Sequence, residues 1–193
     1  MRHVCSVFFV GLIWVSMAQA DVGVTGCDRL AANPPDPDRI IAGVPRADVD
    51  VPAAIAACGL ALEAHPQAAR LHYQLGRVLF YDGQTKLALE SFDRAIGLNY
   101  RQARFLVGLI MTRGYSDVPN DICRVEQLWR LSAHQNHSNA QVSYVQYALD
   151  GRFDACRDRA SKQDLAVFLD GASSQLGYVG GLLIANLRRD LEN

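Results

Sequence analysis

The chain has 193 residues, and its 19 Lys and Arg against 20 Asp and Glu give a net charge of −1. A general nucleic-acid binder carries a strongly basic stripe, so this charge balance argues against that class of protein. The length suits one domain with a continuous core.

The first 20 residues have the pattern of a secretory signal. Arg2 supplies the positive charge, residues 4–17 are almost all apolar, and residues 18–20 form a small-x-small cleavage site. A retained membrane anchor is the alternative, but a spanning helix needs about 20 apolar residues. We therefore expect the mature chain to begin at Asp21 and to have no stable membrane span. After the signal the basic residues are nearly all arginine, which hints at a GC-rich bacterial genome. The expected location is the periplasm or the outside of a bacterial cell.

The cysteine count agrees with export. Loss of Cys5 with the signal leaves four cysteines, and an even number in an exported protein favours disulfides. Four cysteines allow three pairings. Four buried free thiols are one alternative, and a zinc site built from all four is another, although no Cys-x-x-Cys spacing is present. The four residues are Cys27, Cys58, Cys123 and Cys156.

Residues 21–51 are predicted to form an extended, proline-rich arm. The segment 33–38 contains three prolines, which restrict φ and remove backbone donors, and Gly43 and Pro45 interrupt the residues after it. From Pro52 the composition changes to that of an alanine-rich helix, which has this proline near its first turn.

Two amphipathic helices are predicted next. The first covers residues 69–81. Its apolar face consists of Leu71, Leu75, Leu79 and Phe80. The Asp-Gly pair after this helix predicts a turn, and Thr85 can cap a second helix that ends near Gly97.

Positions in these helices recur with a period of 34 residues, which is typical of stacked helical pairs. Ala54, Cys58, Ala61 and Pro66 recur as Ala88, Phe92, Ala95 and Tyr100. The helix pair at 69–97 resembles a tetratricopeptide repeat. The signature spacings are filled by Leu75, Gly76, Leu79, Ala88, Phe92 and Ala95. Gly76 and Ala88 would let the paired helices approach closely. The chain departs from the family at His72, the usual large aromatic position, and at Tyr100, the usual proline.

The period then lengthens to 37 residues. Ala103, Met111, Gly114, Asp117 and Asp121 recur as Ala140, Ala148, Gly151, Asp154 and Asp158. This unit resembles a Sel1-type repeat, a relative of the tetratricopeptide repeat with a longer loop between its helices. The resemblance is carried by Ala103, Gly108, Gly114, Val118, Asp121, Trp129, Ala133 and Ala140. A last helix at residues 182–191 would present charged side chains as a polar cap. The resemblance implies an all-α fold, a short right-handed α-solenoid of antiparallel helix pairs over residues 52–193.

The first repeat lacks a helix. The segment from Ala54 to Leu62 matches the second helix of a repeat, and no first helix precedes it. Cys58 occupies the position that Phe92 fills in the next repeat, so it should face the missing helix. We infer that the arm folds over this face and is held by a Cys27–Cys58 disulfide.

The resemblance also places the other two cysteines close together. Cys123 begins the second helix of one repeat, and Cys156 lies in the inter-helix loop of the next. Because neighbouring repeats bring such loops together, we expect these two cysteines to pair.

No catalytic motif is found, so we expect no enzyme activity, no cofactor and no metal. His134 and His137 are three positions apart and could share a metal, but the end of a helix also favours cationic side chains. Asp150, Asp154 and Asp158 lack the spacing of a calcium loop and alternate with arginines.

The resemblance implies where a partner would bind, because the first helix of each tetratricopeptide pair lines a concave groove. The corresponding positions are Arg70, Tyr73, Arg77, Arg101 and Phe105. Arginine beside aromatic rings suits a peptide with an acidic or C-terminal carboxylate segment. The alternative is that these arginines are simply solvated, and removing Arg70 and Arg77 together is expected to leave the fold intact.

The function implied by the resemblance is that of an exported protein–protein interaction scaffold or regulatory binding module. A structural subunit of an envelope complex is a second possibility. The rival class is a cell-envelope enzyme, or a cell-wall or β-lactam-binding protein of the cysteine-rich Sel1-like type. No serine nucleophile with a paired base is visible in the sequence to support that class.

Overall fold

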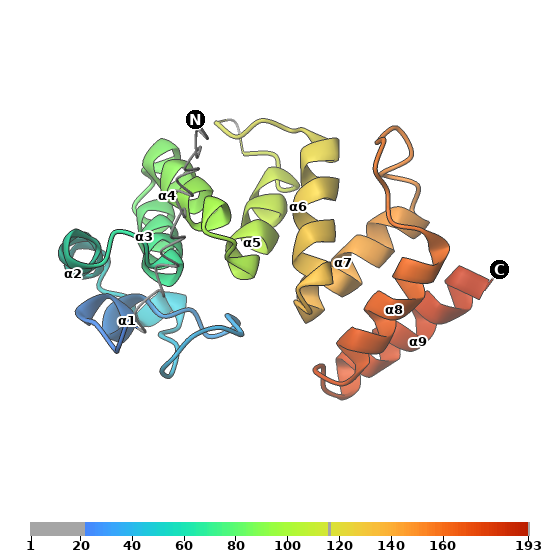
Figure 1. The fold of residues 1–193 in the computed structure, drawn as a ribbon, viewed down its shortest axis with the longest axis horizontal. Helices are drawn as coiled ribbons and strands as arrows, with labels where there is room; N and C mark the ends of the chain where they lie inside the picture. The colour runs from blue at the N-terminus through green and yellow to red at the C-terminus, as the bar shows by residue number, and fades with distance from the viewer. Residues whose placement is uncertain (1–21, 116, 193) are drawn as a thin grey trace, which may run out of the picture.

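The computed structural model describes residues 22–115 and 117–192, and Figure 1 shows them as a row of packed helices. Every regular element within these residues is helical. The elements are α1 (Gly26–Ala31), the 3-10 turn η1 (Arg46–Asp48), α2 (Val51–Ala64), α3 (Ala69–Tyr81), α4 (Thr85–Gly97), α5 (Arg101–Met111), α6 (Ile122–His134), α7 (Ser138–Leu149), α8 (Lys162–Ser173) and α9 (Tyr178–Glu192). The predicted signal at residues 1–20 lies outside the described residues.

Helices that are neighbours in the chain pack against one another. α3 packs on α4, α5 on α6 and α7 on α8, while α9 packs on both α8 and α7. Figure 1 shows these helices in chain order from α1 and α2 at one end to α9 at the other. The predicted all-α solenoid is therefore confirmed.

Glycines determine how closely the paired helices approach. A Cβ atom on Gly76 would lie 2.6 Å from the Phe92 ring, and one on Gly108 would lie 2.2 Å from Nε1 of Trp129. The same indole nitrogen donates a hydrogen bond to the backbone oxygen of Phe105 over 3.0 Å. Since protein interiors are close-packed, only glycine leaves room for these rings. The close-approach role predicted for Gly76 is confirmed.

Residues with positive φ recur with the longer repeat period. Gly114 and Gly151 come after the first helices of two neighbouring repeats, and φ is 69° at both. Asn99 and Asn136 come after helices α4 and α6, with φ of 67° and 58°. Glycine and asparagine are the residues that adopt this left-handed conformation most readily. The sequence period therefore corresponds to a repeated backbone conformation.

The starts of two helices differ from the prediction. Thr85 is the first residue of α4 and does not cap it; the cap position is Gln84, whose side chain makes no capping bond. α9 begins at Tyr178 rather than at Leu182.

The outer face of α9 is mixed rather than polar throughout. Large apolar side chains in its first turns are exposed, namely Tyr178, Val179, Leu182 and Leu183. The charged residues expected to form a polar cap lie only in the last turns, where Arg189, Asp190 and Glu192 are exposed.

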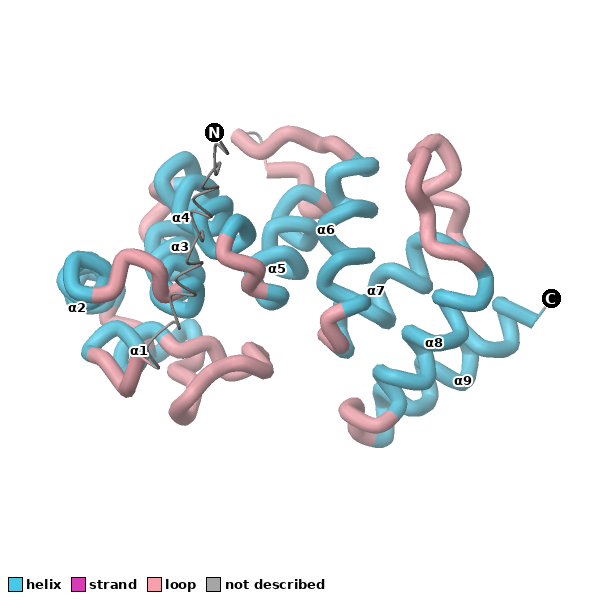
Figure 2. The backbone as a smooth tube through the Cα atoms, in the orientation of Figure 1, coloured by secondary structure: helices cyan, strands magenta, loops and turns pink. Residues whose placement is uncertain are grey.

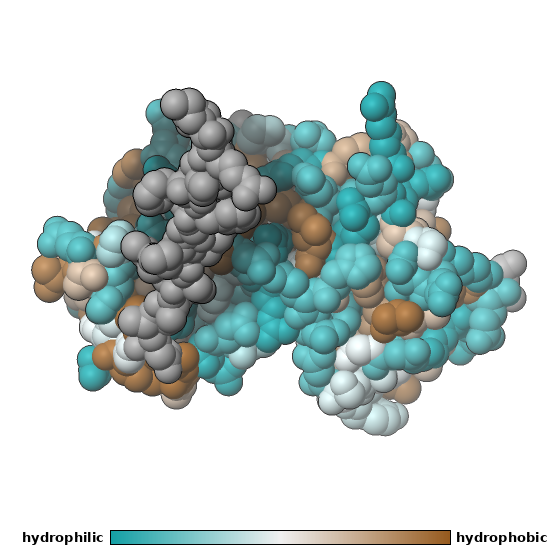
Figure 3. Space-filling model, viewed as in Figure 1, coloured by the Kyte–Doolittle hydropathy of each residue, from teal (hydrophilic) through white to brown (hydrophobic). Residues whose placement is uncertain are grey.

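The surface is mostly hydrophilic on the face shown in Figure 3, and hydrophobic residues gather at the end formed by α1 and α2. Leu60 of α2 is the most exposed large aliphatic residue of that end, at 69%. Among the described residues, no helix combines the length and the apolar character needed to cross a membrane.

A disulfide joins two consecutive repeats. Cys123 in the first turn of α6 is bonded to Cys156 in the loop between α7 and α8, as predicted. Figure 2 shows the long loops before α6 and after α7 on the same edge of the molecule. The bond closes a sequence separation of 33 residues. In the chain-entropy model such a closure stabilises the fold by about 3–4 kcal/mol.

Candidate functional site: the groove filled by the N-terminal arm

The N-terminal arm begins with a helix, which the prediction of an extended arm did not include. α1 is capped by a reciprocal pair: the Thr25 hydroxyl accepts from the backbone N–H of Asp28 (3.3 Å), and the Asp28 carboxylate accepts from the backbone N–H of Thr25 (2.9 Å). A six-residue helix is not stable alone. Its stability must come from this cap and from packing on α2 and α3, which the composition of the arm does not reveal.

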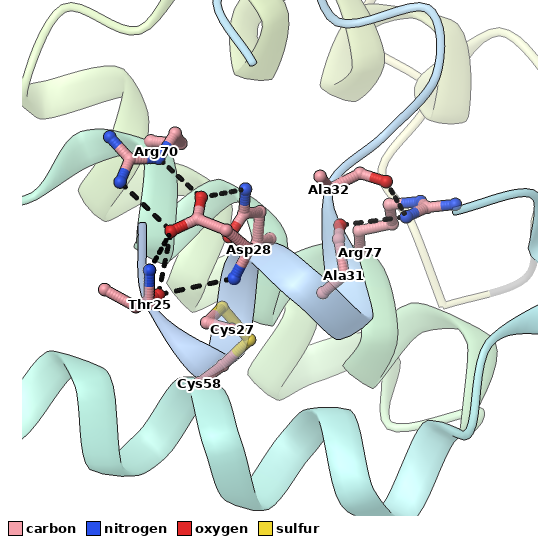
Figure 4. The surroundings of a disulfide bond; sticks show 9 residues. Thr25, Cys27, Asp28, Ala31, Ala32, Cys58, Arg70 and Arg77 are labelled. Atoms are coloured by element: carbon pink, nitrogen blue, oxygen red, sulfur yellow. Dashed lines mark hydrogen bonds and ion pairs between the residues drawn. A yellow bond between two sulfur atoms is a disulfide. The ribbon is translucent and has the colours of Figure 1, made fainter. Parts of the chain in front are cut away.

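α1 takes the place of the missing first helix. Cys27 in α1 is bonded to Cys58 in α2, and both residues are fully buried. Figure 4 shows this bond beside the contacts that tie the same helix to α3. The predicted folding of the arm over the Cys58 face is confirmed.

Arg70 of α3 binds the carboxylate of Asp28 in α1. Nε of Arg70 lies 2.7 Å from Oδ1, Nη2 lies 3.2 Å from Oδ2, and the Gln74 amide also donates to Oδ1 over 3.0 Å. Burial by itself would raise the pKa of Asp28. Hydrogen bonds from Arg70, Thr25 and Gln74 outweigh that effect and hold the pKa below its ordinary value. Asp28 is therefore ionised and paired inside the protein.

Arg77 of α3 is buried and binds the end of the same helix. Its Nη1 donates to the backbone oxygens of Ala31 (2.9 Å) and Ala32 (3.1 Å), and its Nη2 donates to the oxygen of Val44 (2.7 Å). Its Nε donates to the Tyr81 hydroxyl over 2.8 Å. The last carbonyls of a helix lack partners within it, so a cation placed there satisfies them.

The arm then forms a tight loop against Tyr73 and Tyr100. Asn33 donates to the Tyr73 hydroxyl over 2.5 Å, and Tyr100 donates to the carboxylate of Asp36 over 2.7 Å. A Cβ atom on Gly43 would lie 2.3 Å from the backbone nitrogen of Pro34, so the two sides of the loop can touch only with glycine there. Asp36 is fully buried, and burial raises its pKa to about 6.

Arg101 of α5 joins the arm to the next repeat. Its guanidinium binds Asp38 through two contacts of 2.9 and 2.7 Å. Its remaining nitrogen donates to the carbonyl oxygens of Gln135 (2.7 Å) and Asn136 (3.0 Å), which come directly after α6. Hydrogen bonding to Asp38 raises the pKa of Arg101. A single side chain thus connects three segments of the chain.

Phe105 lies in α5, one turn after Arg101, and packs on histidine. Its ring stacks on His137 with centroids 4.8 Å apart. Nδ1 of His137 accepts from the backbone N–H of Ala140 (3.2 Å), so Nε2 carries the hydrogen that is donated to Gln102 over 2.6 Å. Burial lowers the pKa of His137 to about 4, which keeps the ring neutral. His134 is exposed at the end of α6, and its ring packs against Phe168 rather than Phe105.

The five predicted groove residues therefore all have partners within the chain. Four of them contact the arm, and Phe105 packs between repeats. The sequence could not reveal this, because the carbonyl and carboxylate partners are 33–63 positions away in the chain. The sequence signal for these contacts is the presence of acidic residues in the arm. Asp28, Asp36 and Asp38 have the charge that an arginine-lined face would bind.

Two concave regions lie on the first repeats, and the smaller one borders the arm. A broad groove of about 950 Å³ lies between α2 and α4, and its apolar residues include Leu62, Leu75 and Leu79. A smaller pocket of about 220 Å³ lies where η1 meets α3 and α5. Within residues 22–115 and 117–192, no three His, Cys, Asp or Glu side chains are grouped so as to hold a metal ion.

These helix pairs and their groove define an α-solenoid repeat protein. The chain is similar to a Sel1 repeat protein from Oxalobacter formigenes, whose crystal structure superposes with a TM-score of 0.58 at 20% sequence identity. The similarity covers 72% of this chain and 40% of that chain, so the chain matches less than half the length of the Oxalobacter protein. No protein-family model matches the sequence, and no curated protein matches it. The structure thus has the fold of a Sel1-like repeat protein.

Proposed function

We propose that this chain is an exported protein–protein interaction scaffold. Solenoids of helical repeats present extended concave surfaces, and such surfaces commonly bind other proteins. Two disulfides are compatible with an oxidising compartment such as the periplasm or the cell exterior. The alternative of an envelope enzyme or a β-lactam-binding protein has no observation in its favour among the described residues.

One observation supports a partner with acidic character. The arm is a largely irregular segment whose aspartates bind arginines of the first helices, Asp28 on Arg70 and Asp38 on Arg101. Paired hydrogen bonds between guanidinium and carboxylate are both strong and directional. A partner with an acidic segment or a C-terminal carboxylate would meet the same chemistry beside the arm. Among the predicted groove residues, Arg70, Arg101 and Phe105 stay partly exposed.

The test is affinity capture from an envelope extract with the tagged mature protein, followed by mass spectrometry. Capture should weaken as salt is added, because exposed charge attraction is screened within about 8 Å at physiological ionic strength. Arg101→Ala should reduce capture, whereas the control Arg157→Ala, at an exposed residue of the loop after α7, should not. Circular dichroism of both variants tests whether each is folded, so that a loss of capture can be assigned to the side chain.

Two results would contradict the proposal. Equal capture by a folded Arg101→Ala variant would place the partner outside the groove. Failure of the unaltered protein to retain any envelope protein would argue against a scaffold.

A further inference from the structure

The pocket between the arm and the first complete repeat combines apolar walls with positive charge. Its volume is about 220 Å³, and its walls come from η1, α3 and α5. The apolar part includes Phe80, Leu106, Leu109 and Ile110. Three arginines also line it, from three different segments: Arg46, Arg77 and Arg113. No aspartate or glutamate is among its lining residues, although the whole chain has a net charge of −1.

The three arginines differ in how they are held. Arg77 is 2% exposed, and its nitrogens already donate to Tyr81 and to carbonyls of the arm. It is therefore a fixed positive charge in the wall. Arg46 lies over the Tyr81 ring, with its guanidinium carbon 4.6 Å from the ring centroid. This contact orients the Arg46 side chain without using its N–H donors.

Arg46 and Arg113 are exposed side chains at the pocket. In the part of the chain that the structure describes, neither forms an ion pair with a carboxylate. By contrast, two arginines of the repeats that face the arm are paired with its carboxylates, Arg70 with Asp28 and Arg101 with Asp38, each at 2.7 Å. The pocket thus gathers positive charge that no carboxylate of the described residues pairs with.

The charge, the walls and the volume of the pocket limit the class of ligand that it can bind. Like charges gathered near one apolar cavity repel one another, and an anion between them removes that repulsion. Guanidinium groups bind carboxylates through paired hydrogen bonds. The apolar walls favour a hydrophobic group next to the carboxylate. A volume of 220 Å³ is below the range of about 300–1,000 Å³ for pockets that enclose drug-sized ligands, so the hydrophobic group is small.

We propose that this pocket binds a carboxylate that carries a single hydrophobic group. Arg46 and Arg113 bind the carboxylate, and the hydrophobic group lies among Phe80, Leu106 and Ile110. If the ligand is the last residue of a partner chain, the inference rests on the proposed scaffold function and identifies where that chain ends. If the ligand is a free organic acid, the pocket is a small-molecule site. Because Arg46 belongs to the arm, the site exists only when the arm is docked.

The test uses four probes with the intact mature protein: N-acetylphenylalanine, its carboxamide, a hexapeptide ending in phenylalanine, and 3-phenylpropionate. Binding is measured by calorimetry and by chemical-shift changes in NMR spectra. We expect N-acetylphenylalanine to bind at least tenfold more tightly than the carboxamide. Arg46→Ala/Arg113→Ala should lose at least tenfold in affinity. The matched control Arg29→Ala/Arg157→Ala, also at two exposed arginines, should bind as the unaltered protein does.

The probes separate the two sources of ligand. Tighter binding of the hexapeptide than of 3-phenylpropionate assigns the pocket to a chain terminus, and equal binding assigns it to a free acid. Equal affinity for the acid and the carboxamide would overturn the proposal, as would undiminished binding by the double variant. If that variant loses its folded spectrum, Arg113→Glu alone gives the same test. Probe binding and capture of envelope proteins are independent readouts, so either can fail without the other.

Discussion

Arg70 and Asp28 are 42 positions apart in the chain, yet their side chains form a two-point ion pair with contacts of 2.7 and 3.2 Å. Asp28 is fully buried and also caps its own helix through Thr25. The pair therefore couples the stability of α1 to the position of α3. The sequence suggested that this face of α3 would be solvated or would bind a partner. In the structure the arm of the same chain covers it.

Arg70→Ala should destabilise the protein by about 3 kcal/mol, because removing one partner of a buried pair leaves the other charge uncompensated. The expectation that removing Arg70 and Arg77 together leaves the fold intact is revised for the same reason, since Arg77 is buried against the arm. Urea unfolding measures the change. Arg29→Ala is the control, because Arg29 is exposed on the same short helix, and it should change stability by less than about 0.5 kcal/mol. Similar values for the two variants would mean that the pair contributes nothing.

Gly108→Ala should destabilise the protein by about 1–3 kcal/mol, because the new methyl group would overlap the Trp129 indole. Gly59→Ala is the matched control. Gly59 lies within α2, and a Cβ there would meet no atom within 4 Å. This change should stabilise the protein by about 0.5–1 kcal/mol through helix propensity alone. Thermal unfolding of both variants measures the contrast, and equal shifts in the same direction would refute the packing argument.

Removal of the Cys27–Cys58 bond by a double serine substitution should cost about 3–4 kcal/mol in the chain-entropy model. It should also free the arm to protease, with cleavage in residues 32–45. The matched variant lacks Cys123–Cys156, which closes a similar separation of 33 residues against 31. That variant should lose similar stability but keep the arm protected. Arm cleavage in both variants, or in neither, would show that the Cys27–Cys58 bond is not what specifically holds the arm in place.

Asp36 and His137 should oppose each other in the pH dependence of stability. The pKa of Asp36 is raised from 3.8 to about 6 in the fold, so the folded state binds its proton more tightly than the unfolded chain does. The stabilisation is complete below pH 4 and is lost as the pH rises to about 6. The pKa of His137 is lowered from 6.5 to about 4, so its contribution increases with pH over the same interval.

The two contributions are each worth about 3 kcal/mol, since one pKa unit corresponds to 1.36 kcal/mol. Urea unfolding between pH 4 and 7 should therefore show a shallow profile for the unaltered protein. In Asp36→Asn only the His137 contribution remains, so the free energy of unfolding should rise with pH. In His137→Gln only the Asp36 contribution remains, so the free energy of unfolding should fall with pH. Identical profiles for both variants would show that neither group titrates differently in the folded and unfolded states.

The repeat architecture could be predicted from the order of the amino acids, because the contacts that define it are local. Gly76 and Gly108 meet bulky rings of the next helix, and Gly114 and Gly151 follow the first helices of two neighbouring repeats with the same positive φ. Such positions recur at a constant spacing, so the period can be read without knowing any distant contact. The repeat period also predicted the pairing of Cys27 with Cys58, because the helix that contains Cys58 was the only one without a first helix to pack on.

The partners of the arginines in α3 and α5 became visible only in the folded chain. Arg77 donates to backbone carbonyls, and every residue has a carbonyl, so no sequence pattern marks Ala31, Ala32 or Val44 as acceptors. α1 was missed because six residues have too little local preference to form a helix without the surface they pack on. The pocket of Arg46, Arg77 and Arg113 likewise needs three segments brought together by folding. Local spacing determines a repeat, whereas a site built from long-range contacts exists only once the chain has folded.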